Sequence, residues 1–206
     1  HRWGVVPGSS VALFTANDDA RRTARDLAAA GMQIAAVIDP RPDAPPPEGI
    51  DAPYFAGGTV VGTSGRQGLT AIRVASGGKE RRIAADVLGI SGGWNPTVHL
   101  ACHMGGRPVW DEALGAFLPP LEGARGAVPG LIAAGAAAGV FDTAGCLASG
   151  LSAAGEALSR LGLRAPQTTV PEAEYDPGRA TAFFRVRGKG RAWLDFQNDV
   201  TVKDVK

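Results

Sequence analysis

Two stretches near the start of the chain lie where a dinucleotide-binding site would have its diphosphate-binding turn and its ribose-binding acid. The turn Thr15–Ala20 reads TANDDA and separates an apolar run from a helical pattern, where a glycine-rich turn would hold a diphosphate. Asp39 ends the next apolar run, about 20 residues further on, where an acid would hydrogen-bond an adenosine ribose and select NAD over NADP. The alternative interpretation of Asp39 is a strand-ending residue before the turn at Pro40.

The turn itself departs from the glycine pattern that binds a diphosphate. The glycine positions are taken by Thr15, Asn17 and Ala20. Ala20 is small enough and Asn17 can adopt positive φ, but the β-branched Thr15 does so with difficulty. Asp18 and Asp19 can cap the following helix. Their carboxylates would also repel a cofactor diphosphate, since two negative groups about 5 Å apart repel by roughly 3 kcal/mol at an effective dielectric near 20. We therefore predict a degenerate turn with a mainly structural role.

Trp94 is a third candidate for contact with a cofactor. It lies in a Gly-Gly-Trp-Asn loop directly after an apolar strand pattern. In open α/β sheets this end of a strand faces the ligand crevice. The indole could stack on a flavin or an adenine, or it could pack between domains, and both interpretations place Trp94 at a domain boundary.

His99, Cys102 and His103 form a cluster that could ligate a metal. A convincing zinc site needs about four ligands, and the remaining histidine is His1, so we predict a loop or short helix and no metal. A Cys102–His103 nucleophile pair is disfavoured because sequence neighbours do not face each other on a helix. Cys146 lies among Ala, Gly and Leu and is expected to be a small buried hydrophobe.

A strand–helix–strand unit must position the turn and Asp39. Apolar runs at 11–14 and 34–38 predict buried parallel strands. The residues between them predict a helix that starts at Asp18 or Asp19, reaches Ala30 and stops at Gly31. The Pro-rich stretch 40–49 predicts a surface loop.

After the Pro-rich stretch, the sequence pattern changes to one that is typical of short strands. Runs at 59–64, 68–76 and 81–91 predict three strands joined as antiparallel hairpins. The apolar end of the third run, 85–91, predicts a central and buried position in the sheet.

The second half of the chain combines a predicted strand, a helix and a hairpin. Residues 130–139, GLIAAGAAAG, predict a buried strand that leads into a glycine-rich turn, and 141–162 predict a helix of small residues. Residues 166–178 read as a linker, and 182–186 with 192–196 predict a last hairpin.

Composition excludes several classes of protein. The chain has 206 residues, 45% of them hydrophobic and 20% charged, with a formal net charge of +1, which argues against disorder and against a nucleic-acid partner. Neither a signal peptide nor a run of about 18 apolar residues is evident, so we expect no membrane association. Two cysteines make no disulfide framework, and a cytoplasmic location is therefore expected.

The sequence reads as an interior piece of a longer protein. It starts without Met, and Thr201 and Asp204 near its end have the spacing of a helix capping box. On this interpretation the segment Leu131–Leu161 packs against polypeptide outside the chain.

Six strings together resemble the α subunit of bacterial heterotetrameric sarcosine oxidase: RWGVVPG, TANDDA, SGGWNPTVHL, GGRPVWDEALGAF, VPGLIAAGAAAG and DFQNDVTVKD. The resemblance covers essentially the whole chain. It implies a complex in which the partners are the β, γ and δ subunits and the remaining parts of the α subunit. The complex would demethylate sarcosine with O2, giving glycine, H2O2 and formaldehyde or methylenetetrahydrofolate.

The resemblance also implies the cofactors. FAD and FMN belong to the complex, and NAD belongs to the intact α subunit, mostly outside this chain. The amine-oxidising flavin site belongs to the β subunit, so no catalytic residue is expected here and the isolated chain is expected to be inactive. More distant relatives carry a cysteine cluster for an iron–sulfur centre near residues 195–201, where this chain has no cysteine, so none is expected.

The fold class implied is α/β, with an NAD-type Rossmann-like βαβ unit and an antiparallel β-meander over residues 1–120. Residues 121–165 would be a return segment of an incomplete FAD/NAD-type domain, and 166–206 a linker and β-hairpin. Gly135 takes the place where that segment contacts the flavin in relatives. The alternatives are a working NAD(P)-binding domain of a flavoprotein reductase or of another secondary-amine dehydrogenase, and a pure interaction module; the exact amine substrate stays open.

Overall fold

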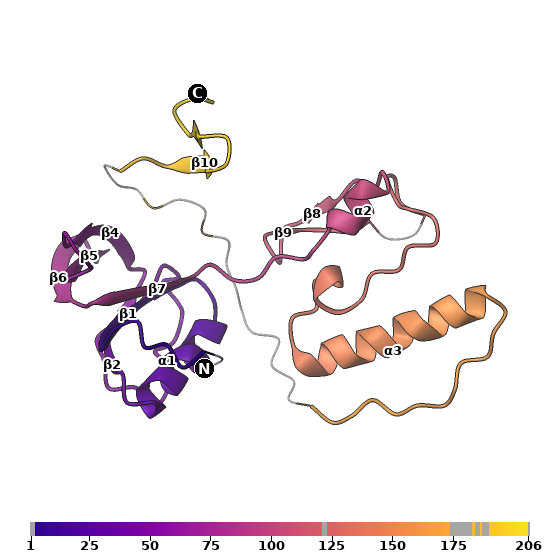
Figure 1. Ribbon diagram of the computed structural model, residues 1–206, viewed down its shortest axis with the longest axis horizontal. Helices are drawn as coiled ribbons and strands as arrows, with labels where there is room; N and C mark the ends of the chain where they lie inside the picture. The colour runs from indigo at the N-terminus through magenta and orange to yellow at the C-terminus, as the bar shows by residue number, and fades with distance from the viewer. Residues whose placement is uncertain (1–2, 121–122, 174–182, 184–185, 187–189, 206) are drawn as a thin grey trace. The chain divides into compact units, whose positions relative to one another are not determined.

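The computed structural model describes residues 3–120, 123–173, 183, 186 and 190–205 (Figure 1). The chain divides into two compact units. Unit 1 comprises His1–Ala16, Ala20–Ser91 and Phe183–Lys206, and unit 2 comprises Asn17–Asp19 and Gly92–Ala182. Parallel and antiparallel sheets occur together with helices, so the architecture is mixed α/β.

Unit 1 is built on a four-stranded parallel sheet in the order β3-β2-β1-β7. Its elements are β1 (Ser10–Thr15), α1 (Asp19–Ala29), β2 (Gln33–Asp39), β3 (Tyr54–Ala56) and β7 (Val87–Ser91). The predicted strand–helix–strand unit is confirmed, since β1 and β2 pair in parallel across the α1 connection. Gly31, with φ of 87°, ends the helix as expected.

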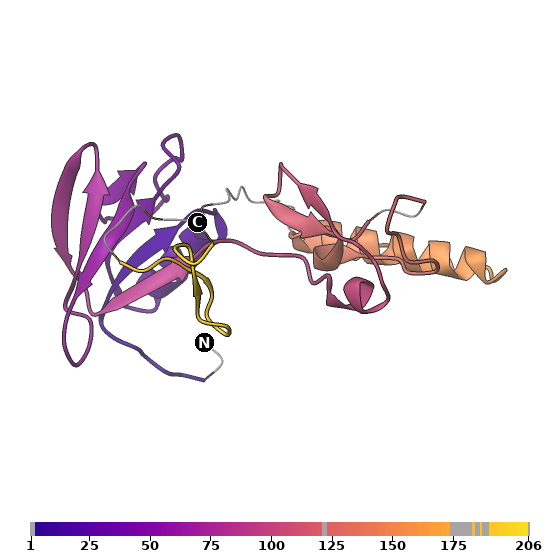
Figure 2. The ribbon, with the colours of Figure 1, turned by 90° about the horizontal axis from the view of Figure 1, so that it is seen from above.

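The two faces of this sheet bury different clusters, because successive strand residues point to opposite faces. On one face Ala24 of α1 packs with Val11, Leu13, Ile34 and Val37. The other face carries Ala12, Ala36 and Ile38, which pack with Ile72 and Val74 of the antiparallel strand over 71–76. Phe55 of β3 and Ala85 complete that cluster. The helix and the meander therefore cover opposite faces of the sheet (Figure 2).

The antiparallel meander consists of β4 (Thr59–Ser64), β5 (Ala71–Ser76) and β6 (Lys79–Ala84), in that order across the sheet. Both predicted hairpins are confirmed. Gly77 and Gly78 have φ of 56° and 74°, the positive values that a two-residue type I′ turn requires between β5 and β6.

The prediction of a single strand over 81–91 was wrong. The chain leaves the meander after Ala84 and enters the parallel sheet at Val87, so this run forms two strands in two sheets. The expected central position was also wrong, because β7 is a half-buried edge strand paired with β1. An apolar run shows that its residues can be buried, but the number of strands beside it depends on residues far away in sequence.

Strand β3, which pairs in parallel with β2 after the Pro-rich loop, was not predicted.

Asp86 lies between β6 and β7, and its carboxylate binds the residues at the start of β1. Its carboxylate accepts hydrogen bonds from the backbone N–H of Ser9 at 2.9 Å and of Ser10 at 2.8 Å, and from the Ser9 hydroxyl at 2.8 Å. Gly8 is required beside it, since an added Cβ would lie 2.6 Å from the Asp86 carboxylate. These hydrogen bonds lower the pKa of the Asp86 carboxyl below its ordinary value.

We expect Asp86→Asn to lower the urea midpoint of unfolding at neutral pH. A carboxyl with a lowered folded pKa contributes stability that is present above its unfolded pKa, near 3.8, and is lost as the pH falls through the lower folded value. The difference between the wild type and the variant should therefore shrink below about pH 4. Urea titrations from neutral pH downward, with the exposed Asp51→Asn as control, check this; an unchanging difference would contradict it.

Unit 2 contains α2 (His99–His103), a hairpin of β8 (Val109–Asp111) and β9 (Ala116–Leu118), the 3-10 turn η1 (Gly135–Ala138) and α3 (Thr143–Arg160). The predicted helix over 141–162 is confirmed, and Asp142 caps it by accepting the Gly145 N–H at 2.7 Å. Of the loop or short helix predicted after Pro96, the structure has the short helix, α2. The β8–β9 hairpin was not predicted.

The predicted strand over 130–139 was wrong. Residues 131–134 form no strand pairing and lead into η1. Alanine and glycine have low β-propensity, and a strand exists only beside another strand, which the described residues do not supply here.

The first strand predicted for the last hairpin, 182–186, lies mostly outside the described residues. The observed partner of β10 (Trp193–Asp195) is β11 (Val200–Thr201), in antiparallel pairing. Thr201 donates its N–H to the Asp204 carboxylate at 2.7 Å, one half of the expected capping box.

Candidate functional site

The predicted dinucleotide turn follows β1 and is closely packed. Thr15, Ala16 and Asn17 are 1%, 4% and 3% exposed. The Ala16 N–H donates to the Ser91 carbonyl of β7 at 3.1 Å. Among the described non-glycine residues only Asp199 has positive φ, so Asn17 does not adopt the conformation of a diphosphate-binding glycine. A turn whose side chains and backbone are already packed leaves little free N–H surface for an anion.

Asp39, at the end of β2, is fully buried and bound by two arginines. Arg41 donates from Nε to Oδ1 at 3.0 Å, from Nη2 to Oδ2 at 2.7 Å and from its backbone N–H to Oδ1 at 3.0 Å. Arg21, from the first turn of α1, lies with Nη2 3.4 Å from Oδ2. This arrangement neutralises a carboxylate that would otherwise be a costly buried charge. A ribose hydroxyl could reach Asp39 only by displacing one of these donors.

Tyr54 of β3 adjoins the same buried ions. Its hydroxyl donates to the Ala44 carbonyl at 2.8 Å, which fastens the Pro-rich loop to the sheet. Burial, and the nearby negative charge of Asp39, raise the pKa of the Tyr54 hydroxyl. Asp39, Arg21, Arg41 and Tyr54 thus form one cluster, which we call the Asp39 cluster.

Sequence reasoning identified Asp39 but missed its partners. The available signal was Arg41, two residues after Asp39 across Pro40, because an Asp-Pro-Arg turn returns the third side chain toward the first. Arg21 gave no comparable signal, since its approach to Asp39 depends on how α1 packs on the sheet.

Asp19 and Trp94 are brought together in unit 2. The Trp94 indole N–H donates to the Asp19 carboxylate at 2.6 Å, while the Trp94 side chain stays 66% exposed. Asp19 opens α1, so the positive end of the helix dipole already faces a carboxylate of the protein itself. A cofactor diphosphate at this point would meet a negative group.

Gly135 is the first residue of η1 and lies against α3. It has φ of 58°, and its N–H donates to the Ser149 hydroxyl at 3.0 Å. The nearest atom to an added Cβ would be the Cys146 sulfur, at 3.4 Å. Cys146 is half-buried and donates to the Val140 carbonyl at 3.0 Å.

The histidine and cysteine side chains of α2 show no metal-site geometry. Within the described residues, no group of three His, Cys, Asp or Glu side chains could hold a metal ion. Cys102 is exposed and forms no disulfide.

In the part of the chain that the structure describes, no helix has the length and apolar character needed to span a membrane.

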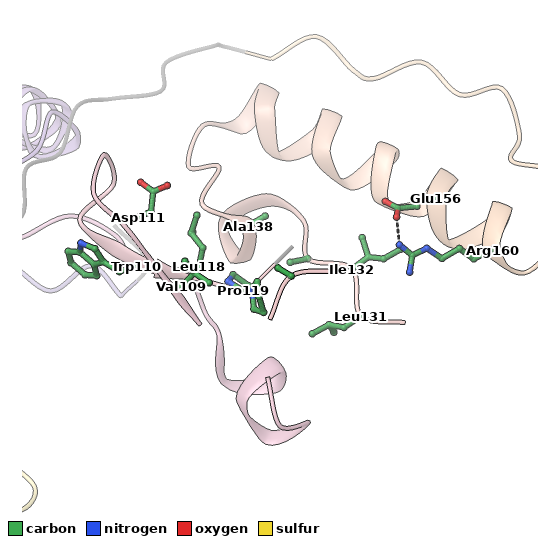
Figure 3. Close-up of a pocket in the computed structure, with 13 residues that line it drawn as sticks. Val109, Trp110, Asp111, Leu118, Pro119, Leu131, Ile132, Ala138, Glu156 and Arg160 are labelled. Carbon is green, nitrogen blue, oxygen red and sulfur yellow. Dashed lines mark hydrogen bonds and ion pairs between the residues drawn. The ribbon is translucent and has the colours of Figure 1, made fainter. Parts of the chain in front are cut away.

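Unit 2 also contains a pocket of about 610 Å³ that none of the predicted site residues lines. Hairpin residues Trp110 and Leu118 lie on one side, and Glu156 and Arg160 of α3, which form an ion pair, lie on the other (Figure 3). Ile132 and Ala138 contribute apolar surface between them. The lining is mainly apolar, and the only charged residues among those that line it are Asp111, Glu156 and Arg160.

These features define a mixed α/β protein with a βαβ unit in a parallel sheet and an antiparallel meander. A solved structure, L-proline dehydrogenase from P. horikoshii, shares this fold with a TM-score of 0.52 and 19% identity, over 80% of this chain and 28% of that one. No family model matches.

The sequence comparison is more specific: the chain is homologous over its whole length to sarcosine oxidase subunit alpha. It is 40% identical over 212 residues to that subunit from Rhizobium meliloti (strain 1021), covering 100% of this chain and 21% of the relative. It is 34% identical to the subunit from Corynebacterium sp. (strain P-1), covering 98% of this chain and 22% of the relative. The chain therefore spans about a fifth of the length of these relatives.

Proposed function

We propose that this chain is part of the α subunit of a flavin-dependent sarcosine oxidase complex, in which it serves as a Rossmann-like scaffold. The full-length homology to sarcosine oxidase subunit alpha supports the assignment to that complex. The Asp39 cluster carries the assignment of a structural role, because the side chain suited to a ribose is committed to Arg41 and Arg21.

In this proposal the reaction takes place elsewhere in the complex. Sarcosine is oxidised with O2 to glycine, H2O2 and formaldehyde or methylenetetrahydrofolate, with FAD and FMN supplying the redox chemistry. The β, γ and δ subunits and the rest of the α subunit are the proposed partners, and the cytoplasm the proposed location. In this proposal residues 1–120 form the scaffold. Residues 121–165 form the return segment with Gly135, and residues 166–206 form a linker and β-hairpin. Trp94 is proposed to lie at a domain boundary.

The competing function is an NAD(P)-binding domain of a reductase, and the position of Asp39 at the end of β2 is the observation that favours it. Isothermal titration calorimetry of the 206-residue chain with NAD and with NADP separates the two. We expect no binding tighter than about 1 mM, since displacement of Arg41 and repulsion by Asp19 both oppose the cofactor.

The control variants are Asp39→Asn and Asp19→Asn, checked for folding by circular dichroism. Micromolar NAD binding by the wild-type chain that is lost in Asp39→Asn would favour the reductase function. Micromolar binding gained in Asp19→Asn would show that this carboxylate closes an otherwise competent site.

A further inference from the structure

The antiparallel meander concentrates positive charge. Residues 59–84 contain five basic side chains and one acidic side chain, which gives this segment a charge of +4 in a chain whose formal net charge is +1. All six side chains are exposed. They are Arg66, Arg73, Lys79, Arg81, Arg82 and the acidic Glu80. A local field of one sign attracts partners of the opposite charge.

Two of these arginines lie directly opposite each other, Arg73 on β5 and Arg82 on β6. Side chains in such a pair share one face of the sheet, with their Cβ atoms about 5 Å apart, so two like charges there repel and destabilise the hairpin. Glu80 lies 3.8 Å from Arg73, but both side chains are more than half exposed and the ion pair is weak. Arg82 has no ion pair or hydrogen bond to any residue that the structure describes.

Gly62 of β4 makes room for the Arg73 guanidinium. It pairs with Arg73 across the two strands, and a Cβ added there would lie 2.5 Å from Nη2 of Arg73. The guanidinium therefore lies over the β4 backbone, in space that any larger residue would fill. A glycine inside a strand weakens the strand, and it is found where another group approaches the backbone closely. The meander thus holds Arg73 in an exposed position beside Arg82. We call Arg73 and Arg82 the arginine pair.

The chemistry of the meander favours carboxylates as the ligands of the arginine pair. A guanidinium presents planar donors that match a carboxylate in bidentate geometry, and one carboxylate between two arginines would relieve their repulsion. A nucleic acid is disfavoured because β4, β5 and β6 carry no aromatic side chain on which a base could stack. A membrane surface is disfavoured because residues 59–84, all described by the structure, expose no large apolar side chain.

We propose that the arginine pair docks an acidic segment of another subunit of the complex, whose Asp or Glu carboxylates bind Arg73 and Arg82. Arginine is enriched in interfaces between proteins. Complementary charges steer separate molecules together and fix their orientation, an advantage that a contact within one chain does not need. This inference rests on the proposed function, since it takes the chain to be part of a complex of several subunits.

The charge reversal Arg82→Glu in the full-length α subunit tests the proposal. Sedimentation velocity of this subunit mixed with the other subunits measures the association. At 50 mM NaCl we expect the variant to associate about tenfold more weakly than the wild type, because an attraction becomes a repulsion. Wild-type association should weaken as NaCl rises to 500 mM, and that of the variant should change less. In the 206-residue chain, the variant should keep the wild-type urea midpoint, since Arg82 is exposed.

Arg25→Glu is the matched control. Arg25 is an exposed arginine of α1, which covers the opposite face of the parallel sheet from the meander. The substitution makes the same change in charge and should leave the association unchanged. Equal effects of Arg25→Glu and Arg82→Glu would overturn the proposal, because net charge and not the arginine pair would then govern assembly.

Arg82→Lys identifies the partner, because it keeps the charge and supplies an amine that a carbodiimide couples directly to a carboxylate. In the assembled complex, we expect mass spectrometry to find a cross-link from position 82 to an Asp or Glu of another subunit. A cross-link only to the α subunit itself, or none, would overturn the proposal.

Binding of the full-length subunit to a DNA duplex or to phosphatidylserine vesicles that Arg82→Glu abolishes would also overturn the proposal, and would assign the arginine pair to that partner. Sarcosine oxidation by the wild-type complex is measured separately. Its absence would refute the proposed function, while the association and cross-linking results would still judge the docking surface.

Discussion

We expect Arg41→Ala to lower the free energy of unfolding of unit 1 by about 3–5 kcal/mol, the range for removal of one partner of a buried ion pair. Asp39 has no exposed surface, and Arg41 supplies four hydrogen bonds to its carboxylate, three of them from the guanidinium. The side-chain substitution removes those three and leaves a buried charge with the more distant Arg21, at 3.4 Å. Urea denaturation followed by far-ultraviolet circular dichroism measures the loss.

The control for this prediction is Arg66→Ala, which removes an exposed arginine from the loop between β4 and β5 and should change stability by less than about 0.5 kcal/mol. The double variant Asp39→Ala/Arg41→Ala should cost less than the sum of its single variants, because the two side chains are coupled. Equal effects of Arg41→Ala and Arg66→Ala would show that the Asp39 cluster contributes nothing to folding.

Ile38→Ala should destabilise unit 1 by about 2–5 kcal/mol, the range for an aliphatic side chain deleted from a packed core. Ile38 has no exposed surface and lies in the cluster that joins β2 to the meander through Ile72 and Val74. Removing three carbons there leaves a cavity between the two sheets, and the cavity can close only if the sheets move together. Chemical denaturation of the purified variant gives the value.

Ile90→Ala is the matched control, since Ile90 is also a strand isoleucine but is 72% exposed on the edge strand β7. Its loss should stay below about 1 kcal/mol because little apolar area returns to water. Comparable losses in the two variants would mean that the sheet–meander interface is not the main core of the unit.

The Asp39 cluster and the Asp19–Trp94 hydrogen bond suggest how a nucleotide-binding architecture can become a scaffold. Arg41 binds the carboxylate that a ribose would otherwise bind, and the Asp19 carboxylate, which accepts from Trp94, lies where a cofactor diphosphate would meet a negative group. The βαβ unit keeps its packing, with Ala24 of α1 fully buried against the sheet. Under the proposed function, this region serves folding and assembly, and the Arg41 variant measures its contribution to folding.

Local sequence patterns were sufficient for the elements that depend on near neighbours. The apolar runs of β1 and β2, the stop of α1 at Gly31, the glycine turn between β5 and β6, and α3 with its Asp142 cap each follow from a few adjacent residues. The position of Asp39 at the end of β2 could be predicted for the same reason.

Tertiary structure alone decided which strands are neighbours and which charges meet. The edge position of β7, the pairing of β3 with β2 and the absence of a strand at 131–134 depend on partners distant in sequence. So does the approach of Arg21 to Asp39. The physical reason is that periodicity records which side of an element is apolar, whereas hydrogen-bond and ion-pair partners are chosen by the packing of the whole chain.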